Sequence, residues 1–254
     1  MDNRKVRLGK KNPRRDARTL QLKKYIVTPV PHIPDEVSWV THVSNWPMYL
    51  NDSLGDCVIA AAAHMIEQWS LYAQQPALPT DDQVLSAYQH VGGYVPGDPT
   101  TDNGCFMLDA LRFWRNTGIA GHQIKAFLGV DPKNLDEVRA AVYLFGNLYA
   151  GLSLPAFAQD ETAASAGWTV ALGGPFGSTG SPGGWGGHCV PIVAMSPLTL
   201  TCVTWGQTLK MSHNFFLDYC DEAYAVLSND WIETNGLSPG SFDLAALQAD
   251  LAQL

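Results

Sequence analysis

Residues 51–66 constrain the fold of this chain more than any other stretch. They read NDSLGDCVIAAAAHMI, in which a turn containing Gly55 leads into Cys57 and then into residues that are almost all apolar. A helix that is apolar on every side is buried in the middle of a domain. The stretch therefore predicts a central helix from about Asp56 to Tyr72, with Cys57 in its first turn.

The position of Cys57 has a chemical consequence. The first turn of a helix has N–H groups without intrahelical partners and carries the positive end of the helix dipole. Both favour the thiolate, which is the nucleophilic form of cysteine. The alternative is that Cys57 is a small buried core residue, as free cysteines often are.

Length and composition narrow the class of protein. The chain has 254 residues, of which 46% are hydrophobic and 16% charged, which suits one large domain or two small ones with a substantial core. Its apolar runs are too short for a membrane span, and no apolar segment of a signal peptide follows the basic N-terminus. The five cysteines have no paired spacing. We therefore expect reduced thiols, a cytoplasmic location and no contact with membrane.

Charge is distributed unevenly along the chain. Residues 1–24 contain ten Lys or Arg and two Asp, whereas the net charge of the whole chain is −8. Residues 1–32 are interpreted as a basic N-terminal arm and an extended, proline-containing strap. Such an arm binds nucleic acid, docks on an acidic surface of a partner or neighbouring subunit, folds back on its own body, or remains a solvated tail.

The pattern of elements predicts an α+β fold for a domain spanning residues 33–237. Helices are expected in a first half, about 50–145, and strands in a second half, about 146–232. A capping box at Thr80–Gln83 begins the second helix, and Gly118 ends the third. A closing amphipathic helix is expected within 238–254. A cleft between two such halves is a usual place for a site. The expected helices are 56–72, 80–91, 105–114, 134–144 and 213–219, the expected strands are 148–154, 168–171, 189–194, 198–206, 208–211 and 222–227, and a mobile glycine-rich loop is expected at 173–187.

Catalysis by a cysteine requires an imidazole, a group that orients it, and donors for the developing oxyanion. His188 is the best candidate for the base, because it begins a strand in the second half and follows Gly186 and Gly187. Asn51 and the backbone N–H of Cys57 are candidate oxyanion donors.

Four segments, in this order, resemble the papain-like cysteine peptidases: residues 33–39 (IPDEVSW), 51–57 (NDSLGDC), 187–190 (GHCV) and 204–206 (TWG). The resemblance covers about residues 33–230. It implies a helical half with a central buried helix, packed against an antiparallel sheet. It also implies the roles of the site residues: Cys57 as nucleophile, His188 as base, Asn51 as oxyanion donor, Trp205 as a shield over the histidine, and Gly55, Asp56 and Gly187 in the substrate cleft.

The sequence departs from the family pattern at several points. The family usually has glutamine where Asn51 stands. Its orienting asparagine is replaced, by Val203 when counted back from Trp205 and by Thr204 when counted forward from His188. Valine cannot orient an imidazole, whereas a threonine hydroxyl can accept a hydrogen bond from it. The family's disulfides are absent, and the 32 residues before the strap are shorter than its usual inhibitory pro-segment.

The sequence leaves several functions open. The first is a papain-like cysteine hydrolase that cleaves a peptide or isopeptide bond, with a polypeptide as substrate or protein partner; a cell-wall amidase and a deubiquitinase-like isopeptidase are variants of it. The second is a catalytically weak or inert binding module, such as a virus-particle component docked by its arm. A zinc site built from Cys57, His64, His188 and Cys189 lacks the usual ligand spacing. No metal or cofactor is predicted, and His64 is expected to be structural.

Overall fold

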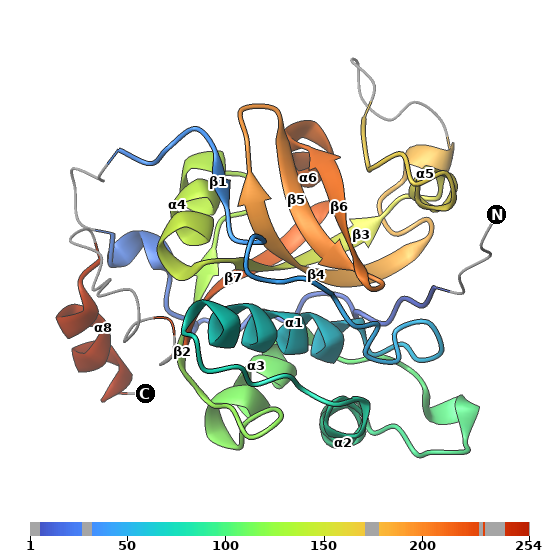
Figure 1. Ribbon diagram of the computed structural model, residues 1–254, viewed down its shortest axis with the longest axis horizontal. Coiled ribbons are helices and arrows are strands. Elements are labelled where there is room, and N and C mark those ends of the chain that lie inside the picture. The colour runs from blue at the N-terminus through green and yellow to red at the C-terminus, as the bar shows by residue number, and fades with distance from the viewer. Residues whose placement is uncertain (1–5, 27–31, 171–177, 229–230, 232–241, 254) are drawn as a thin grey trace.

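The structure is a computed structural model in which residues 6–26, 32–170, 178–228, 231 and 242–253 are described. Its centre is an antiparallel sheet with the strand order β2-β7-β3-β4-β5-β6, and a short strand β1 pairs with the far end of β4. Figure 1 shows helix α1 lying along one side of this sheet, with α2 and α3 beyond it. The strands are β1 (Val37–Ser38), β2 (Ile124–Val130), β3 (Leu148–Leu154), β4 (Gly186–Met195), β5 (Thr199–Thr204), β6 (Gln207–Ser212) and β7 (Cys220–Ser228). The helices are α1 (Cys57–Tyr72), α2 (Asp81–Gly92), α3 (Met107–Asn116), α4 (Leu135–Phe145), α5 (Phe157–Ala163), α6 (His213–Tyr219) and α8 (Leu244–Leu251), with short 3-10 turns at Leu22–Lys24, Pro99–Thr101 and Ser178–Gly180.

The predicted central helix is confirmed. Every residue of α1 from Cys57 to Ser70 is buried. Near the C-terminal end of α1, Gln68 and Trp69 donate side-chain hydrogen bonds to the carbonyl oxygens of Gly146 and Phe145, at 2.7 and 2.9 Å. These bonds hold the helix against the turn between α4 and β3, so the position of its N-terminus relative to the sheet is fixed.

Local sequence signals explain where several helices begin and end. The Thr80 side chain and Gln83 form the predicted capping box at the start of α2, and Gly93 ends that helix in the left-handed conformation. Asn134 caps α4 by accepting from the N–H groups of its first turn, and Gly146 ends it with a φ of 80°.

The α+β fold is as predicted, but the two halves are less separate than the sequence suggested. Strand β2 lies within the predicted helical half, yet it pairs with β7 at the edge of the sheet. Helix α4 also packs on the sheet, because its apolar residues Val138, Val142 and Phe145 share one core with residues of β3 and β4. The alternation of Ile124, Ala126, Leu128 and Val130 was the sequence signal for β2.

Smaller differences concern the ends of elements. Helix α3 begins at Met107, because Cys105 instead pairs with the N-terminal arm. Trp168 forms one isolated bridge with Met211 where a strand was expected. The short helix α5 was not predicted. The predicted glycine-rich loop lies partly outside the described residues, which resume at 178 with a 3-10 turn and continue into β4.

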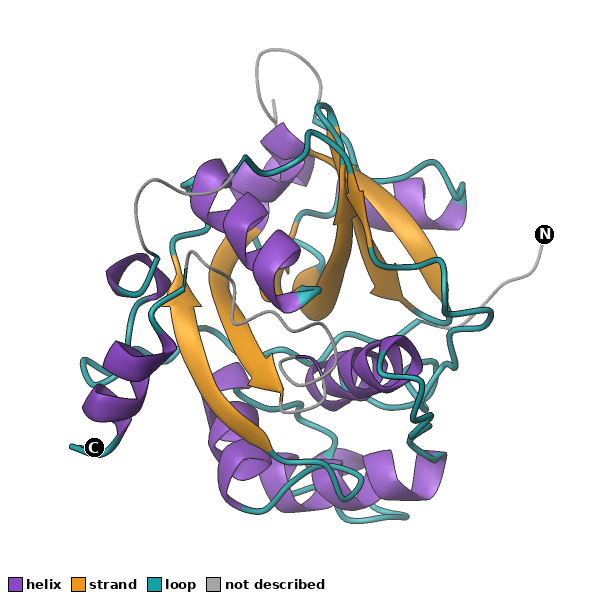
Figure 2. Ribbon diagram, turned by 60° about the vertical axis from the view of Figure 1, so that its left-hand side comes forward, coloured by secondary structure: helices purple, strands orange, loops and turns teal. Residues whose placement is uncertain are grey.

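The N-terminal arm extends across the molecule to the C-terminal helix α8. Residues 6–26 cross the body at the level where α1 meets the sheet, and their far end reaches α8 (Figures 1 and 2). There Lys24 and the Tyr25 hydroxyl both contact Asp250, each at 2.6 Å.

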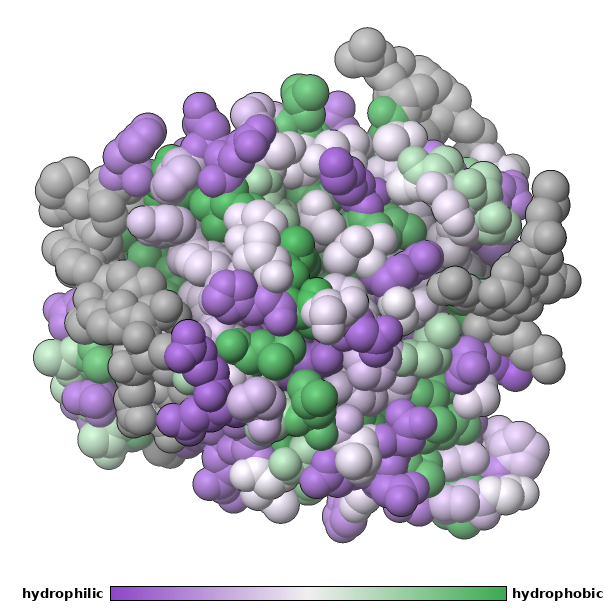
Figure 3. All heavy atoms as spheres, in the orientation of Figure 1, coloured by the Kyte–Doolittle hydropathy of each residue, from purple (hydrophilic) through white to green (hydrophobic). Residues whose placement is uncertain are grey.

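Few large hydrophobic side chains are exposed in the described part of the surface. On the face shown in Figure 3, hydrophobic residues are interspersed with hydrophilic ones. The large hydrophobic residues exposed in the described ranges are Leu78, Val95 and Leu198. Those same ranges contain no helix of the length and apolarity that crossing a membrane demands.

Candidate active site

The candidate nucleophile lies where the helix layer meets the sheet. Cys57 is the first residue of α1, and it lines a small cavity together with His188 of β4 and Thr204 of β5. Cys57 and His188 are 131 positions apart in the chain, and the packing of α1 on β4 brings them together. Cys57 and His188 are each only 1% exposed.

His188 is held by the neighbouring strand. Its Nε2 lies 2.7 Å from the hydroxyl oxygen of Thr204, and both residues are buried. The other ring nitrogen, Nδ1, is buried without a hydrogen-bond partner in the described ranges. A neutral imidazole that donates its Nε2–H to Thr204 leaves the Nδ1 lone pair free to accept a proton. Val203 and Thr204 are the two residues that could replace the family's orienting asparagine. Of these, Thr204 is the one that forms a hydrogen bond with His188.

A tight turn places an indole on the same imidazole. Thr204 and Gln207 pair across the β5–β6 hairpin, so Trp205 and Gly206 form a two-residue loop. Their φ angles are 45° and 73°, as in the turn type that suits hairpins but strains a residue with a side chain. The strained turn lays the Trp205 ring parallel to His188, with centroids 4.4 Å apart and an interplanar angle of 16°. The indole thus covers the His188–Thr204 pair.

The turn before α1 is held by its own polar groups. The amide nitrogen of Asn51 donates to the Leu54 carbonyl oxygen and to Oδ1 of Asp56, each at 3.1 Å. Both amide hydrogens are thereby engaged within the turn, so an oxyanion role for Asn51 requires the side chain to turn away from these acceptors. Asp56 is fully buried, and burial raises the pKa of its carboxyl group well above the usual value.

His64 has the structural role predicted for it. Its Nε2 lies 2.8 Å from the Pro47 carbonyl oxygen, and its ring packs against Trp46 and Tyr49. Burial lowers the pKa of His64 to about 4, so the ring is neutral near pH 7.

The N-terminal arm fills the cleft beside Cys57. We call residues 7–11 the cleft segment. The N–H groups of Gly9 and Lys10 both donate to the Gly187 carbonyl oxygen, at 3.2 and 3.0 Å. Across the cleft, Cys105 N–H donates to the Gly9 carbonyl oxygen at 2.9 Å, and Lys11 N–H donates to the Cys105 carbonyl oxygen at 3.0 Å. The arm is therefore bound like an added strand between the helical layer and the sheet.

Close backbone approach explains a glycine in this segment. A Cβ atom on Gly9 would lie 1.7 Å from the Gly55 carbonyl oxygen, in the turn that leads to Cys57. The neighbouring contacts are equally tight, since a Cβ on Gly104 would lie 1.8 Å from the Gly9 carbonyl oxygen. Trp205 also donates its indole N–H to the Arg7 carbonyl oxygen at 3.2 Å. A few extended residues are enough to cross the cleft, although residues 1–32 are shorter than the usual inhibitory pro-segment of the papain-like family.

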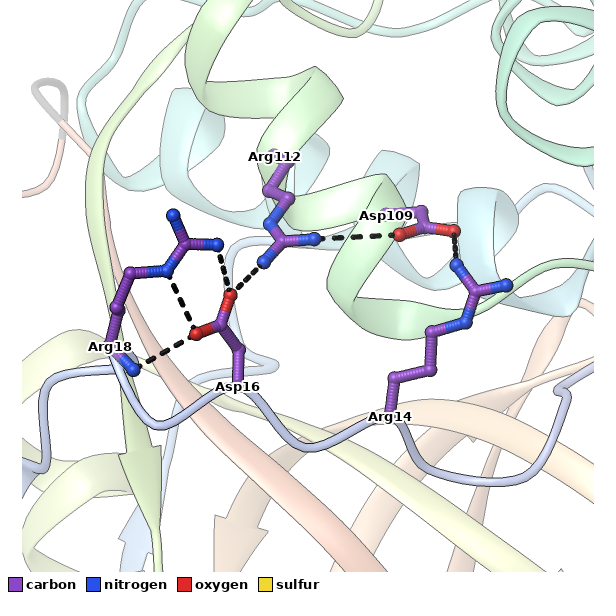
Figure 4. Close-up of polar contacts among 5 residues, drawn as sticks. All are labelled: Arg14, Asp16, Arg18, Asp109 and Arg112. Atoms are coloured by element: carbon purple, nitrogen blue, oxygen red, sulfur yellow. Dashed lines mark hydrogen bonds and ion pairs between the residues drawn. The ribbon is translucent and has the colours of Figure 1, made fainter.

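The rest of the arm is held in part by ion pairs at the surface. We call residues 14–24 the outer segment. Asp16 binds Arg18 of the arm and Arg112 of α3, while Arg14 binds Asp109 of α3 at 2.6 Å (Figure 4). The Arg14 guanidinium also lies over the ring of Phe106, 3.4 Å from its centroid. The described part of the arm thus folds back on its own body, which was one of the four readings of its charge.

Burial under the arm opposes ionisation of the candidate pair. It raises the pKa of Cys57 to about 12, against smaller opposing effects of the Cys189 and Gly9 backbones. Burial also lowers the pKa of His188 to about 3. The expected thiolate is therefore not the state of this closed cleft, where both groups are neutral.

Two further features bear on the chemistry of the site. All five cysteines are free and buried. Where the structure is described, no group of three or more His, Cys, Asp or Glu side chains could hold a metal ion.

Comparison with solved structures identifies the fold. The chain matches xylellain, a cysteine protease from Xylella fastidiosa, with a TM-score of 0.66 and 13% identity over 90% of this chain and 98% of that one. It also matches a Carica candamarcensis cysteine protease in complex with E-64, with a TM-score of 0.54 and 14% identity over 78% of this chain and 100% of that one. A third match is the digestive procathepsin L 3 of Tenebrio molitor larval midgut, with a TM-score of 0.56 and 11% identity over 88% of this chain and 76% of that one. No protein-family model and no curated protein sequence matches the chain. The fold is therefore that of the papain-like cysteine proteases, as the sequence resemblance predicted.

Proposed function

We propose that this protein is a papain-like cysteine hydrolase that cleaves a peptide or isopeptide bond through Cys57 and His188, and that its own N-terminal arm closes the cleft. The observation that carries the proposal is the arrangement of His188. One ring nitrogen contacts Thr204, an indole covers the ring, and the second nitrogen is left without a partner in the cavity that the thiol of Cys57 also lines. A histidine that served only the core would have both nitrogens satisfied.

The chemistry begins when the cleft segment leaves. Water then reaches the site, and the burial that keeps both groups neutral is reduced. The proton of the Cys57 thiol passes to Nδ1 of His188, while Nε2–H continues to donate its hydrogen bond to the Thr204 hydroxyl oxygen. The helix N-terminus and the imidazolium both stabilise the thiolate.

The remaining steps follow from this ion pair. The Cys57 sulfur attacks the carbonyl carbon, and the negative charge on the carbonyl oxygen is stabilised by N–H groups of the first turn of α1. His188 then gives its proton to the leaving amine, and a thioester remains on Cys57. Water attacks the thioester, its proton passes to His188, and the carboxylic acid and the free thiol are restored.

The alkylation rate of Cys57 by iodoacetamide, followed against pH, tests the proposal. Wild-type protein should react slowly, because the thiol is buried. In Gly9→Ala the new Cβ cannot be accommodated beside Gly55, so the arm is displaced and we expect the rate to rise about 100-fold. That rate should persist below pH 7 and be lost in Gly9→Ala/His188→Ala. Cys57→Ala is the blank. A rate in Gly9→Ala that rises only near pH 8.5, the ordinary thiol value, and ignores His188 would contradict the proposal.

The contribution of Thr204 can be measured in the same background. Thr204→Val keeps the side-chain shape but removes the hydroxyl that accepts from His188, whereas Thr204→Ser retains it. Loss of one hydrogen bond worth about 1.4 kcal/mol should lower the Cys57 alkylation rate at pH 6 about tenfold. The serine variant should stay within threefold. Equal rates in the two variants would remove Thr204 from the mechanism.

One observation favours the second candidate, an inert module of the same fold. The thiol and imidazole are buried and neutral beneath an arm that is held by both backbone pairing and ion pairs. In such a module the arm would stay seated, and Gly9→Ala would lower stability without producing a reactive thiol. The same alkylation experiment therefore decides between the two candidates.

A further inference from the structure

The cleft contains an acidic pocket that is filled by a lysine of the arm. The side chain of Lys10 is 1% exposed, and its ammonium lies 2.9 Å from Oδ1 of Asp221 and 3.3 Å from Oε1 of Glu222, both on β7. The Lys11 carbonyl oxygen accepts a third contact from the ammonium at 3.2 Å. Tyr224 donates its hydroxyl hydrogen to the other carboxylate oxygen of Glu222 at 3.0 Å.

The walls of the pocket suit the stem of a long, unbranched side chain. A Cβ on Gly151 of β3 would lie 2.2 Å from Cε of Lys10 and 2.7 Å from the sulfur of Met107. The absence of a side chain at Gly151 therefore makes room for the lysine stem. Apolar walls and a carboxylate end together select a side chain with an aliphatic stem and a cationic head.

The pocket and the nucleophile are contacted by adjacent residues of the arm. Gly9 packs on the turn before Cys57, and its backbone acts to lower the pKa of the Cys57 thiol. The next residue, Lys10, fills the pocket. A polypeptide that places one carbonyl group at Cys57 must therefore place a neighbouring side chain in the same pocket.

We infer that the substrates of this protein are polypeptides with lysine or arginine directly before the residue whose carbonyl group Cys57 attacks. This inference rests on the proposed function. Glu222 is buried, so a substrate with an apolar side chain in the pocket, instead of lysine or arginine, would leave the Glu222 carboxylate without a cation. Leaving a buried charge unpaired is strongly unfavourable, so the pocket discriminates by charge and not only by size.

The direction of the arm explains why it blocks the cleft with a residue that the pocket prefers. The arm pairs in parallel with Cys105 and remains intact across the nucleophile. The inference requires a cleaved chain to run in the opposite direction along the cleft. Its pocket residue then precedes the attacked residue, whereas Lys10 follows Gly9.

The first test uses the Gly9→Ala protein and three fluorogenic peptides that differ at one position. They are acetyl-Lys-Gly-, acetyl-norleucyl-Gly- and acetyl-Glu-Gly-aminomethylcoumarin. We expect kcat/KM for the lysine peptide to exceed that for the norleucine peptide about 100-fold, with the glutamate peptide lowest. Asp221→Asn/Glu222→Gln, added to Gly9→Ala, should bring the lysine and norleucine peptides to within about threefold. Asp218→Asn, which removes an exposed carboxylate on α6, is the matched control and should leave the preference unchanged.

A second readout needs no turnover. The free peptide RLGKKNP, identical to residues 7–13, and its analogue with norleucine at the first lysine are used to protect Cys57 of Gly9→Ala from iodoacetamide. The lysine peptide should protect at concentrations at least about 30-fold lower. If no substrate is cleaved but this difference appears, the proposed function fails and the charge selectivity of the pocket stands. Equal protection by the two peptides, or cleavage without preference for lysine, would overturn the inference.

Discussion

The cleft segment and the outer segment belong to one basic arm, but they are held in different ways. The cleft segment is bound through its backbone and through one cation, Lys10, which is almost fully buried. The outer segment is bound through the buried side chain of Leu22 and a backbone hydrogen bond from Gly129 to Leu20, but its cations remain in contact with solvent. The side chains of Arg14 and Arg18 are 51% and 75% exposed. Exposed pairs contribute little and are screened by salt, whereas a buried pair that loses one partner is costly.

This difference shows that charge alone does not reveal what an arm does. Ten basic residues among the first 24 suggested a polyanionic partner as readily as contact with the body. Among those that the structure describes, only Lys10 occupies a buried acidic pocket next to a candidate nucleophile. Closure of the cleft is therefore expected to depend on Lys10 and on the glycine before it, and only weakly on the outer segment.

The largest effect should come from Lys10→Met. Methionine fills the pocket but leaves Glu222 and Asp221 without the ammonium. A loss of about 3 kcal/mol in arm binding is expected, which corresponds to an increase of about 100-fold in the alkylation rate of Cys57. Lys11→Met is the matched control, because Lys11 lies over the Phe106 ring at 5.1 Å and outside the acidic pocket. Similar rates in the two variants would show that the buried cation does not hold the arm.

The second prediction concerns pH. Burial raises the pKa of Glu222, and the nearby Lys10 opposes this rise. When the arm leaves, the opposition by Lys10 and part of the burial are lost together, so Glu222 does not set the direction of the pH dependence. The pKa of His188, lowered to about 3 by burial, returns toward 6.5. In Cys57→Ala, where no thiol proton can pass to His188, the open state therefore binds more protons than the closed state, and closure weakens as the pH falls from about 6.5.

Hydrogen exchange at the amides of Gly9 and Lys11 in Cys57→Ala measures this opening. After correction for intrinsic exchange rates, opening should increase at least about tenfold between pH 7 and pH 5. Cys57→Ala/His188→Ala should lose the dependence. The outer segment should show no such change, because hydrogen bonds from Arg18 and from Lys24 lower the pKa values of Asp16 and Asp250 and keep both ionised at pH 5. A pH-independent cleft segment would contradict the prediction.

The sequence predicted the framework of the site well, because its signals are local. A short turn followed by an apolar helix indicated Cys57 as the candidate nucleophile, and glycines before a strand indicated His188 as the candidate base. The hairpin turn that carries Trp205 explains why Thr204, and not Val203, contacts the imidazole. The choice between these two needed the strand register, since adjacent residues of a strand point to opposite faces.

The closed cleft could not be predicted in the same way. The sequence around Cys57 favoured a thiolate, but burial in the cleft that residues 7–11 cross raises the pKa of Cys57 to about 12 instead. Gly9 was the relevant signal, since a glycine between Leu8 and Lys10 permits close backbone approach, yet its contacts with Gly55 and Gly104 are non-local. Strand β2 was missed for a different reason, because its alternation of apolar residues is short and lies between two helices.

The smallest effect is expected from Asp16→Asn, which removes the carboxylate shared by Arg18 and Arg112. The outer segment should open a few-fold more often, seen as faster exchange at the amide of Gly129, which donates to the Leu20 carbonyl oxygen at 2.8 Å. Raising NaCl from 0.1 to 1 M shortens the screening length from about 10 to 3 Å and should have a similar effect on wild-type protein. The alkylation rate of Cys57 should change less than twofold in both cases, because Lys10 is shielded from salt. A large increase in that rate would mean that the outer segment controls the cleft and that the two segments open as one unit.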